Sequence, residues 1–474
     1  MNASAVCSVA LSFMVLPLSA TEGSVRFIQR TMRKMAESTE ENPTTVRMLF
    51  YGQSIVEQGW HENLVRILRK RYPTVNFEAR NLAIGGFTSE VLIRTAESDL
   101  YPEYADVVFF HDRGSTALVR TMIERLRART TSEIVMWTSH VNRKDAANRS
   151  LEELKREDDV RSRDLAAIAD DNHCMFVNLR RKWCETLIEK GWSADRLLQE
   201  DGVHLNAKSE AFDLYARCIA DDMERLDGVG SDEWSGRITE IAADRLVGKE
   251  FVANADGSID FPFVGNRVEL SFAPYSGFVG SPFRVLLDGK PLSEHPELFR
   301  HKRASNLISW MPLLLHQGAR TLPVAETWRL TFLEGTSPDG KPICYRVDGS
   351  RTGFDGEGRS DRDFVSKSGR VTIKASDFHV WQYGHFVKGD SDCAAKPGQW
   401  IAWETVADFQ EVFGQYKPAG KTFVVLSGCT NGPHRLTFVP SVPSRRPCLE
   451  KLIVYKPLVL SQSWGWNPCL KLAA

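Results

Sequence analysis

Apolar and polar positions change their period along this chain, and the change divides it into two parts. Between about residues 45 and 226, short β-branched or aromatic runs alternate with longer stretches of helical period. The expected strands are Val46–Tyr51, Val75–Asn81, Val107–Phe110, Glu133–Thr138 and Met175–Asn178, and the expected helices are Ile55–Arg71, Ser89–Ala96, Thr116–Arg129, Ser150–Asp170 and Ala207–Leu226. Strands separated by helices predict a parallel sheet with helices on both faces, which is a three-layer α/β domain.

After Leu226 the helical period nearly disappears. A linker is expected from Gly228 to Asp232, and short alternating runs punctuated by turns follow it. These runs are Ile259–Val264, Arg267–Phe272, Phe283–Leu287 before the hairpin signal Asp288-Gly289, Thr327–Phe332, Arg370–Ile373, Gln399–Trp403, Thr422–Leu426 and His434–Val439. Many short strands at this spacing predict an all-β, jelly-roll-like sandwich over residues 235–440. The tail, residues 441–474, is expected to pack back on the body.

The N-terminus contains an apolar run from Ala5 to Ala20 that ends in small residues, where a signal peptidase would cut. No basic residue precedes the run, so a misassigned start or a loosely packed helix is the alternative. The run is shorter than the roughly 18 residues that a spanning helix needs. We therefore expect a signal peptide over residues 1–20, a leader and spacer over 21–45, and a secreted or periplasmic protein without a stable membrane span.

The composition, with 42% hydrophobic and 26% charged residues, is ordinary for a globular protein. Sixty basic and 61 acidic residues nearly cancel, so nucleic acid and anionic membranes are not expected as partners. Removal of Cys7 with the signal peptide would leave an even number of cysteines, which fits either disulfides or free thiols. Their spacing contains no Cys-x-x-Cys pair, so no zinc site is indicated.

The candidate chemistry begins where the first expected strand stops, at Gly52-Gln53-Ser54. A serine at such a strand end can present its hydroxyl at the edge of a sheet, although many Gly-x-Ser turns are only helix caps. Downstream, Asp201 stands three residues before His204, a spacing that lets the carboxylate bind Nδ1 and leaves Nε2 free to accept the serine proton. Between them, the segment Asn81 to Ser89 contains paired glycines whose backbone could present an N–H to an oxyanion.

With these three blocks, residues 45 to 226 resemble the SGNH (GDSL-type) hydrolases. The resemblance implies a flavodoxin-like catalytic domain over residues 46–227, with Ser54, Asp201 and His204 as the catalytic residues. It also implies that the amides of Ser54 and Gly86 bind the oxyanion. Gln53 replaces the acid that is usual in the first block. The third block of the family, Gly-x-Asn-Asp, is replaced by His111 to Thr116, and no asparagine is present to supply the third oxyanion donor.

The loop that replaces the third block offers other polar groups. His111, Arg113 and the Gly114 amide are candidates for the missing donor, and Asp112 and His140 are candidates for substrate binding, with a structural role as the alternative. Tryptophans 381, 400 and 403 could stack on sugar rings or fill the core of the sandwich.

These expectations describe an exported serine esterase that hydrolyses O-acyl esters, above all O-acetyl esters, on carbohydrate through an acyl-enzyme. The mechanism needs no metal and no organic cofactor. The partner would be an acylated carbohydrate or another small ester. A lipid esterase or thioesterase is one alternative, and a non-catalytic glycan-binding protein built on a hydrolase fold is another.

Overall fold

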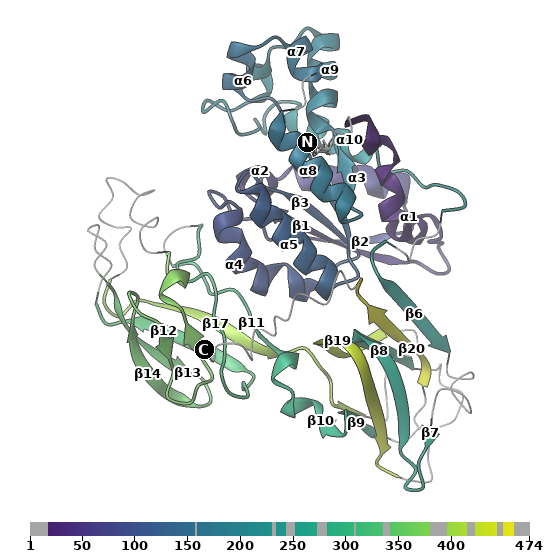
Figure 1. Ribbon diagram of the computed structural model, residues 1–474, viewed down its shortest axis with the longest axis vertical. Coiled ribbons are helices and arrows are strands. Elements are labelled where there is room, and N and C mark those ends of the chain that lie inside the picture. The colour runs from purple at the N-terminus through teal and green to yellow at the C-terminus, as the bar shows by residue number, and fades with distance from the viewer. Residues whose placement is uncertain are drawn as a thin grey trace, which may run out of the picture.

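The computed structural model describes residues 18–156, 159–229, 234–242, 252–272, 282–307, 310–334, 342–379, 396–414, 422–442 and 449–458. A helix-rich part and antiparallel sheets lie side by side in it (Figure 1). The first part contains β1 (Thr45–Gly52), β2 (Asn76–Asn81), β3 (Val107–His111), β4 (Glu133–Trp137) and β5 (Met175–Val177). They pair in parallel in the order β2-β1-β3-β4-β5, which confirms the expected α/β fold of flavodoxin-like type.

The helices of this part are α1 (Gln29–Ala36), α2 (Ser54–Glu57), α3 (Trp60–Arg71), α4 (Ser89–Asp99), α5 (Thr116–Arg129), α6 (Arg143–Asn148), α7 (Leu151–Arg156), α8 (Val160–Asp171), α9 (Leu179–Lys190) and α10 (Ala211–Ala220). The helix expected from Ile55 to Arg71 is interrupted, because Gln58 takes an extended ψ of 150° and ends α2. Helix α9 was not predicted, although it buries Leu179, Trp183 and Leu187 along one face.

The sheet has a buried core on each face. Along neighbouring strands, Phe50 and Phe109 belong to one cluster of buried side chains, whereas Tyr51 and Phe110 belong to another. This alternation is the period of a strand, and burial on both faces explains why the strands read as continuous apolar runs. The carboxyl ends of the strands remain as the edge at which loops can form a site.

The leader and spacer expected over residues 21–45 are a wrong prediction for the part that precedes β1. A 3-10 helix, η1 (Leu18–Ile28), and α1 pack on the α/β part, and Ile28, Met32 and Met35 are buried in its core. The Glu133 carboxylate accepts hydrogen bonds from the first backbone amides of α1, at 2.9 Å from Arg30 N and 2.7 Å from Thr31 N. The basic residues Arg30, Arg33 and Lys34 lie on the other face of this helix.

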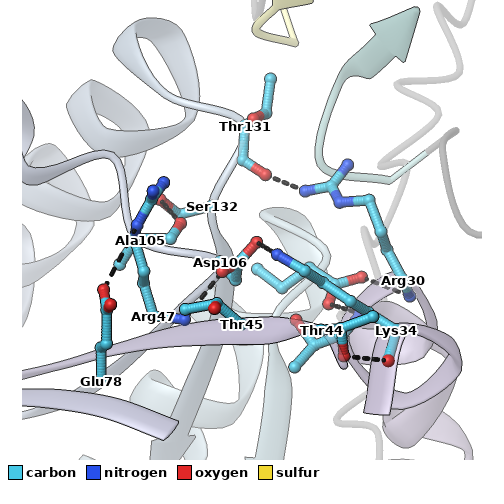
Figure 2. A network of polar contacts seen from close by, with 12 residues as sticks. Arg30, Lys34, Thr44, Thr45, Arg47, Glu78, Ala105, Asp106, Thr131 and Ser132 are labelled. Carbon is cyan, nitrogen blue, oxygen red and sulfur yellow. Dashed lines mark hydrogen bonds and ion pairs between the residues drawn. The ribbon is translucent and has the colours of Figure 1, made fainter. Parts of the chain in front are cut away.

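A polar network joins α1 to the start of β1 and β3 (Figure 2). Asp106 accepts from Lys34 Nζ at 2.8 Å and from Arg47 N at 2.8 Å, and Arg30 donates to the Thr131 carbonyl. The segment before β1 is therefore held at the edge of the sheet opposite to the carboxyl ends of the strands.

The second part is all-β, as expected, with its strands divided between two main antiparallel sheets. One contains β6 (Arg237–Ala242), β7 (Val252–Ala253), β8 (Ile259–Phe272), β9 (Phe283–Leu287), β10 (Lys290–Pro291), β18 (Val412–Phe413), β19 (Thr422–Pro440) and β20 (Leu449–Lys456). The other contains β11 (Phe299–His301), β12 (Glu326–Phe332), β13 (Cys344–Gly349), β14 (Gly353–Arg359) and β17 (Trp400–Ala407). A short hairpin, β15 (Phe364–Val365) and β16 (Thr372–Ile373), accompanies the second sheet, and each main sheet has its own buried cluster.

The C-terminal tail and two of the tryptophans named above lie within this all-β part. The tail contains more than a segment packed on the body, because its strand β20 pairs with both β8 and β6 inside the sheet. Trp403 is buried in the core, whereas Trp400 is exposed and carries the Arg329 guanidinium 4.4 Å from its ring centroid. Residues 1–17, Trp381 and the end of the tail from 459 lie outside the described residues. The other expected domain bounds stay predictions.

None of the described helices is long and apolar enough to cross a membrane. The five cysteines among the described residues, Cys174, Cys184, Cys218, Cys344 and Cys429, are free thiols.

Candidate active site

The end of β1 places Ser54 at the carboxyl edge of the sheet. At Gly52, a Cβ atom would lie only 2.0 Å from the His111 carbonyl oxygen, so the chain can leave the sheet here only with glycine. Gln53 then caps α2, because its Oε1 accepts from Ile55 N at 2.7 Å. Ser54, the first residue of the helix, is half-buried, and its hydroxyl lies 3.1 Å from the Gln53 Oε1.

The structure brings Asp201 and His204 to this serine. His204 Nε2 lies 2.8 Å from the Ser54 Oγ, and His204 Nδ1 lies 2.5 Å from the Asp201 carboxylate. Because an ionised carboxylate can only accept, Nδ1 carries the imidazole proton and Nε2 is left to accept the proton of the serine. This chain of contacts has the geometry of a Ser-His-Asp triad.

Asp201 is held in its charged form. Partial burial acts to raise the pKa of its carboxyl group, but hydrogen bonds from the His204 imidazole and from the amides of Val203 and His204 outweigh this effect and lower the pKa to about 2. The two amides donate to Oδ1 at 2.8 and 3.0 Å, and the imidazole contacts Oδ2. One oxygen therefore fixes the turn while the other orients the histidine.

Two further side chains position the loop that carries His204. Gln58, just after α2, donates to the Leu205 carbonyl at 2.9 Å and accepts from the Leu205 amide at 3.0 Å. His140 Nε2 lies 2.8 Å from the Val203 carbonyl, and burial lowers the pKa of this histidine to about 4, so that its neutral ring donates there. His140 is 1% exposed and does not line the pocket, which corrects the expectation that it contacts substrate.

The glycine turn after β2 faces the same edge. Gly86 has a φ of +79°, and a Cβ atom on it would lie 2.2 Å from the Met311 methyl group, so both its conformation and its contact require glycine. Neither the Ser54 amide nor the Gly86 amide has a hydrogen-bond acceptor among the described residues. These two N–H groups are the available donors for an oxyanion.

The loop after β3 contains three candidates for a third donor, and two of them already have partners. Both ring nitrogens of His111 are occupied, by Gln53 Nε2 at 3.0 Å and Ser139 Oγ at 3.2 Å, and the Gly114 amide donates to Asp112 at 2.6 Å. The expectations that His111 or Gly114 faces the oxyanion are therefore wrong. The Asp112 side chain is 1% exposed and closes the loop, which corrects its expected role in substrate binding.

Arg113 remains a candidate for that donor. Its guanidinium forms no hydrogen bond or ion pair with the described part of the chain. After burial, its charge is the next cause that lowers the pKa of His111, and it also lowers the pKa of His140. Its charge thus lies near the carboxyl ends of β3 and β4, at the same edge of the sheet as Ser54.

Comparison with known proteins gives only distant likenesses. No family model and no curated protein matches the sequence. A two-domain esterase, CEX, active on acetylated mannans, is similar over 92% of this chain and 96% of its own, with 12% identity and a TM-score of 0.34. Axe2, an acetylxylan esterase from Geobacillus stearothermophilus, is similar over 38% of this chain and 95% of its own, with 18% identity and a TM-score of 0.32. Both are too distant to carry an argument about activity.

Sequence reasoning missed several residues of the site. Gln58 gives no local signal, because a glutamine in the first turn of an expected helix is a common surface residue. Trp310 and Met311 come from the β part and reach the Gly85–Gly86 turn through the fold alone.

Proposed function

We propose that this protein is a serine hydrolase of carboxylic esters. The observation that carries the proposal is the continuous contact from Ser54 through His204 to Asp201, at 2.8 and 2.5 Å, at the carboxyl edge of a parallel sheet. The His204 imidazole thus contacts a hydroxyl through one ring nitrogen and an ionised carboxylate through the other, which is the arrangement that activates a serine.

The chemistry follows from these positions. The Ser54 Oγ attacks the ester carbonyl while its proton passes to His204 Nε2, and Asp201 stabilises the imidazolium that forms. The amides of Ser54 and Gly86 bind the oxyanion. Collapse of the tetrahedral intermediate releases the alcohol, which takes the proton from His204. Water then attacks the acyl-enzyme, with His204 again as base, and releases the acid and the free serine.

We propose an O-acyl, above all O-acetyl, ester on carbohydrate as the substrate. The His204 and Asp201 side chains are 32% and 46% exposed, so the triad lies at the surface and can approach an ester on a bulky hydrophilic chain. A lipid esterase or thioesterase would instead need an apolar tunnel for the acyl chain. Export, which would bring the enzyme to extracellular glycans, rests on residues 1–20 and stays a prediction.

Two assays test this function. Release of acetate from O-acetylated xylan, mannan and cellulose oligosaccharides measures the proposed reaction directly. Hydrolysis of 4-nitrophenyl esters from acetyl to octanoyl measures the acyl preference, and we expect kcat/KM to fall as the chain lengthens. A rise toward octanoyl would favour a lipid esterase or thioesterase. Glycan binding without release of acetate or nitrophenol would identify a non-catalytic glycan-binding protein.

A further inference from the structure

The segment that carries the Gly86 amide is a β-turn, Ile84 to Phe87, called the oxyanion turn below. The Phe87 amide donates to the Ile84 carbonyl at 3.2 Å, and Gly86, the third residue of the turn, has a φ of +79°. This φ is typical of a type II turn, in which the third position favours glycine. The central peptide of the turn joins the Gly85 carbonyl to the Gly86 amide, so the direction of one group fixes the direction of the other.

Trp310 of the β part holds the carbonyl end of this central peptide. It lies in the segment between β11 and β12, and its indole N–H donates to the Gly85 carbonyl at 3.0 Å. In a planar trans peptide the C=O and the N–H point in opposite directions. The Gly86 amide therefore points away from the indole nitrogen. A hydrogen bond to the carbonyl also polarises the peptide and makes its N–H a stronger donor.

A peptide between two glycines can take either of two orientations. Type I and type II turns differ mainly by a rotation of the central peptide, which directs its N–H to the opposite face of the turn, and glycine tolerates the φ that each type requires. Glu57 of α2 holds the preceding peptide: burial raises the pKa of Glu57, and a hydrogen bond from the Gly85 amide opposes this rise. The hydrogen bond from Trp310 acts on the peptide that is able to flip.

The position of Trp310 is fixed by contacts on both sides of it. Asn306 Nδ2 donates to the Trp310 carbonyl at 2.7 Å, and the next residue, Met311, is buried in the core of the α/β part. Arg303, at the start of the same segment, lies 3.3 Å from Asp99 at the end of α4. Separation of this ion pair would leave a buried carboxylate unpaired, so the segment resists displacement from the α/β part.

We propose that Trp310 is a positioning residue for ester hydrolysis, because its indole N–H locks the oxyanion turn in the orientation that directs the Gly86 amide to the oxyanion. The β part thereby contributes to a site whose triad and oxyanion amides belong to the α/β part. The effect on rate rests on the proposed function, since the amide acts when charge develops on the substrate oxygen. The orientation of the peptide does not depend on turnover.

The test compares two substitutions that differ in the donor. Trp310→Phe keeps an aromatic ring without the N–H, whereas Trp310→His can place its Nε2 where the indole carries Nε1. We expect kcat on 4-nitrophenyl acetate to fall about tenfold in Trp310→Phe, with KM within about twofold of wild type, because the lost interaction acts in the transition state. Trp310→His should keep more of the rate than Trp310→Phe.

A role in packing alone would reverse this order, because phenylalanine is closer to tryptophan in size and apolarity than histidine is. Trp400→Phe is the matched control, since Trp400 lies on β17 and is 45% exposed, and it should leave kcat unchanged. An unchanged kcat in a Trp310→Phe protein that is folded by circular dichroism, or a faster Trp310→Phe than Trp310→His, would overturn the positioning role.

NMR of protein labelled with ¹⁵N-glycine separates this inference from the proposed reaction. The Gly86 amide resonance reports the orientation of its peptide without turnover, and it should move in Trp310→Phe. The resonance of Gly191, at the end of α9, should stay in place. If wild type hydrolyses no ester and the Gly86 resonance still moves, only the esterase is contradicted. A Gly86 resonance that stays in place would contradict the lock on the oxyanion turn itself.

Discussion

Gln53 Nε2, one residue before the candidate nucleophile Ser54, donates to His111 Nδ1 at 3.0 Å. The Gln53 Oε1 accepts from Ile55 N at 2.7 Å, so the amide orientation is determined by its two neighbours. Burial lowers the pKa of His111 well below its ordinary value, and the neutral ring donates from Nε2 to Ser139 at 3.2 Å. Gln53, which replaces the acid of the first block, thus links the nucleophile turn to the loop that replaces the third block.

Removal of the hydrogen bond between Gln53 and His111 should change the position of Ser54. In Gln53→Ala, we expect loss of the helix cap to lower the free energy of unfolding by about 1 kcal/mol. We expect kcat on 4-nitrophenyl acetate to fall about tenfold, because misplacement of a reacting group is costly.

In Gln53→Glu, a carboxylate would face His111 Nδ1 and move the imidazole proton to that nitrogen, which ¹⁵N NMR of the ring can detect. Wild-type kcat in both variants would show that the link does not position the serine.

Arg113 is the remaining candidate for the third oxyanion donor. Loss of one such donor costs about 10²–10³ in kcat where it has been measured, so Arg113→Ala should lower kcat by that factor with a smaller change in KM. Arg113→Lys should retain part of the rate. Arg120→Ala is the control, because Arg120 of α5 pairs with Asp171 at 2.8 Å. If Arg113→Ala keeps kcat within about threefold of wild type, the two backbone amides are sufficient.

Asp201 should act through its charge. Its pKa of about 2 keeps it ionised over any ordinary assay range. Asp201→Asn would remove that charge and favour the wrong tautomer of His204, which should lower kcat by about 10⁴. Asp195→Asn, which affects a surface ion pair with Arg143, serves as the control. A loss of less than about tenfold in the Asp201 variant would mean that the histidine is oriented by other groups.

The buried histidines predict how stability depends on pH. Burial lowers the pKa of His301 to about 4, so between about pH 4 and 6.5 the unfolded chain binds a proton that the folded chain does not. Stability should therefore be lost as the pH falls through this window. We expect wild type to lose up to about 3 kcal/mol more than His301→Gln between pH 7 and 4. Urea unfolding of both proteins measures the difference, in which groups common to both cancel, and equal losses would contradict a neutral His301.

Local patterns predicted much of the α/β part. The strands of the sheet could be read from apolar runs because each is buried on both faces. The contact between Asp201 and His204 could be predicted from their spacing, because the two residues are only three positions apart in the sequence. Ser54 could be placed because Gly52 and Gln53 determine the turn within two residues.

Contacts between distant segments could not be predicted in this way. The basic sequence of α1 is typical of a solvated leader, and its place in the fold depends on its buried apolar face and on contacts with Glu133 of β4 and with Asp106, just before β3. Strand β19 was expected as two strands, because residues near Gly432 have the composition of a turn. In the structure that stretch is an irregularity in the ladder with β8. Trp310 has no signal in its own neighbourhood, since its hydrogen bond to the Gly85 carbonyl depends on the docking of the β part on α4.

The central claim is that Ser54 is the nucleophile of an esterase, and one comparison tests it most directly. Release of acetate from acetylated oligosaccharides and of nitrophenol from 4-nitrophenyl acetate is measured for wild type, Ser54→Ala and the exposed control Ser293→Ala. We predict that Ser54→Ala keeps the melting temperature of wild type and loses a factor of about 10⁴ or more in kcat on both substrates. Ser293→Ala should match wild type. A folded Ser54→Ala protein with activity within about tenfold of wild type would contradict the account.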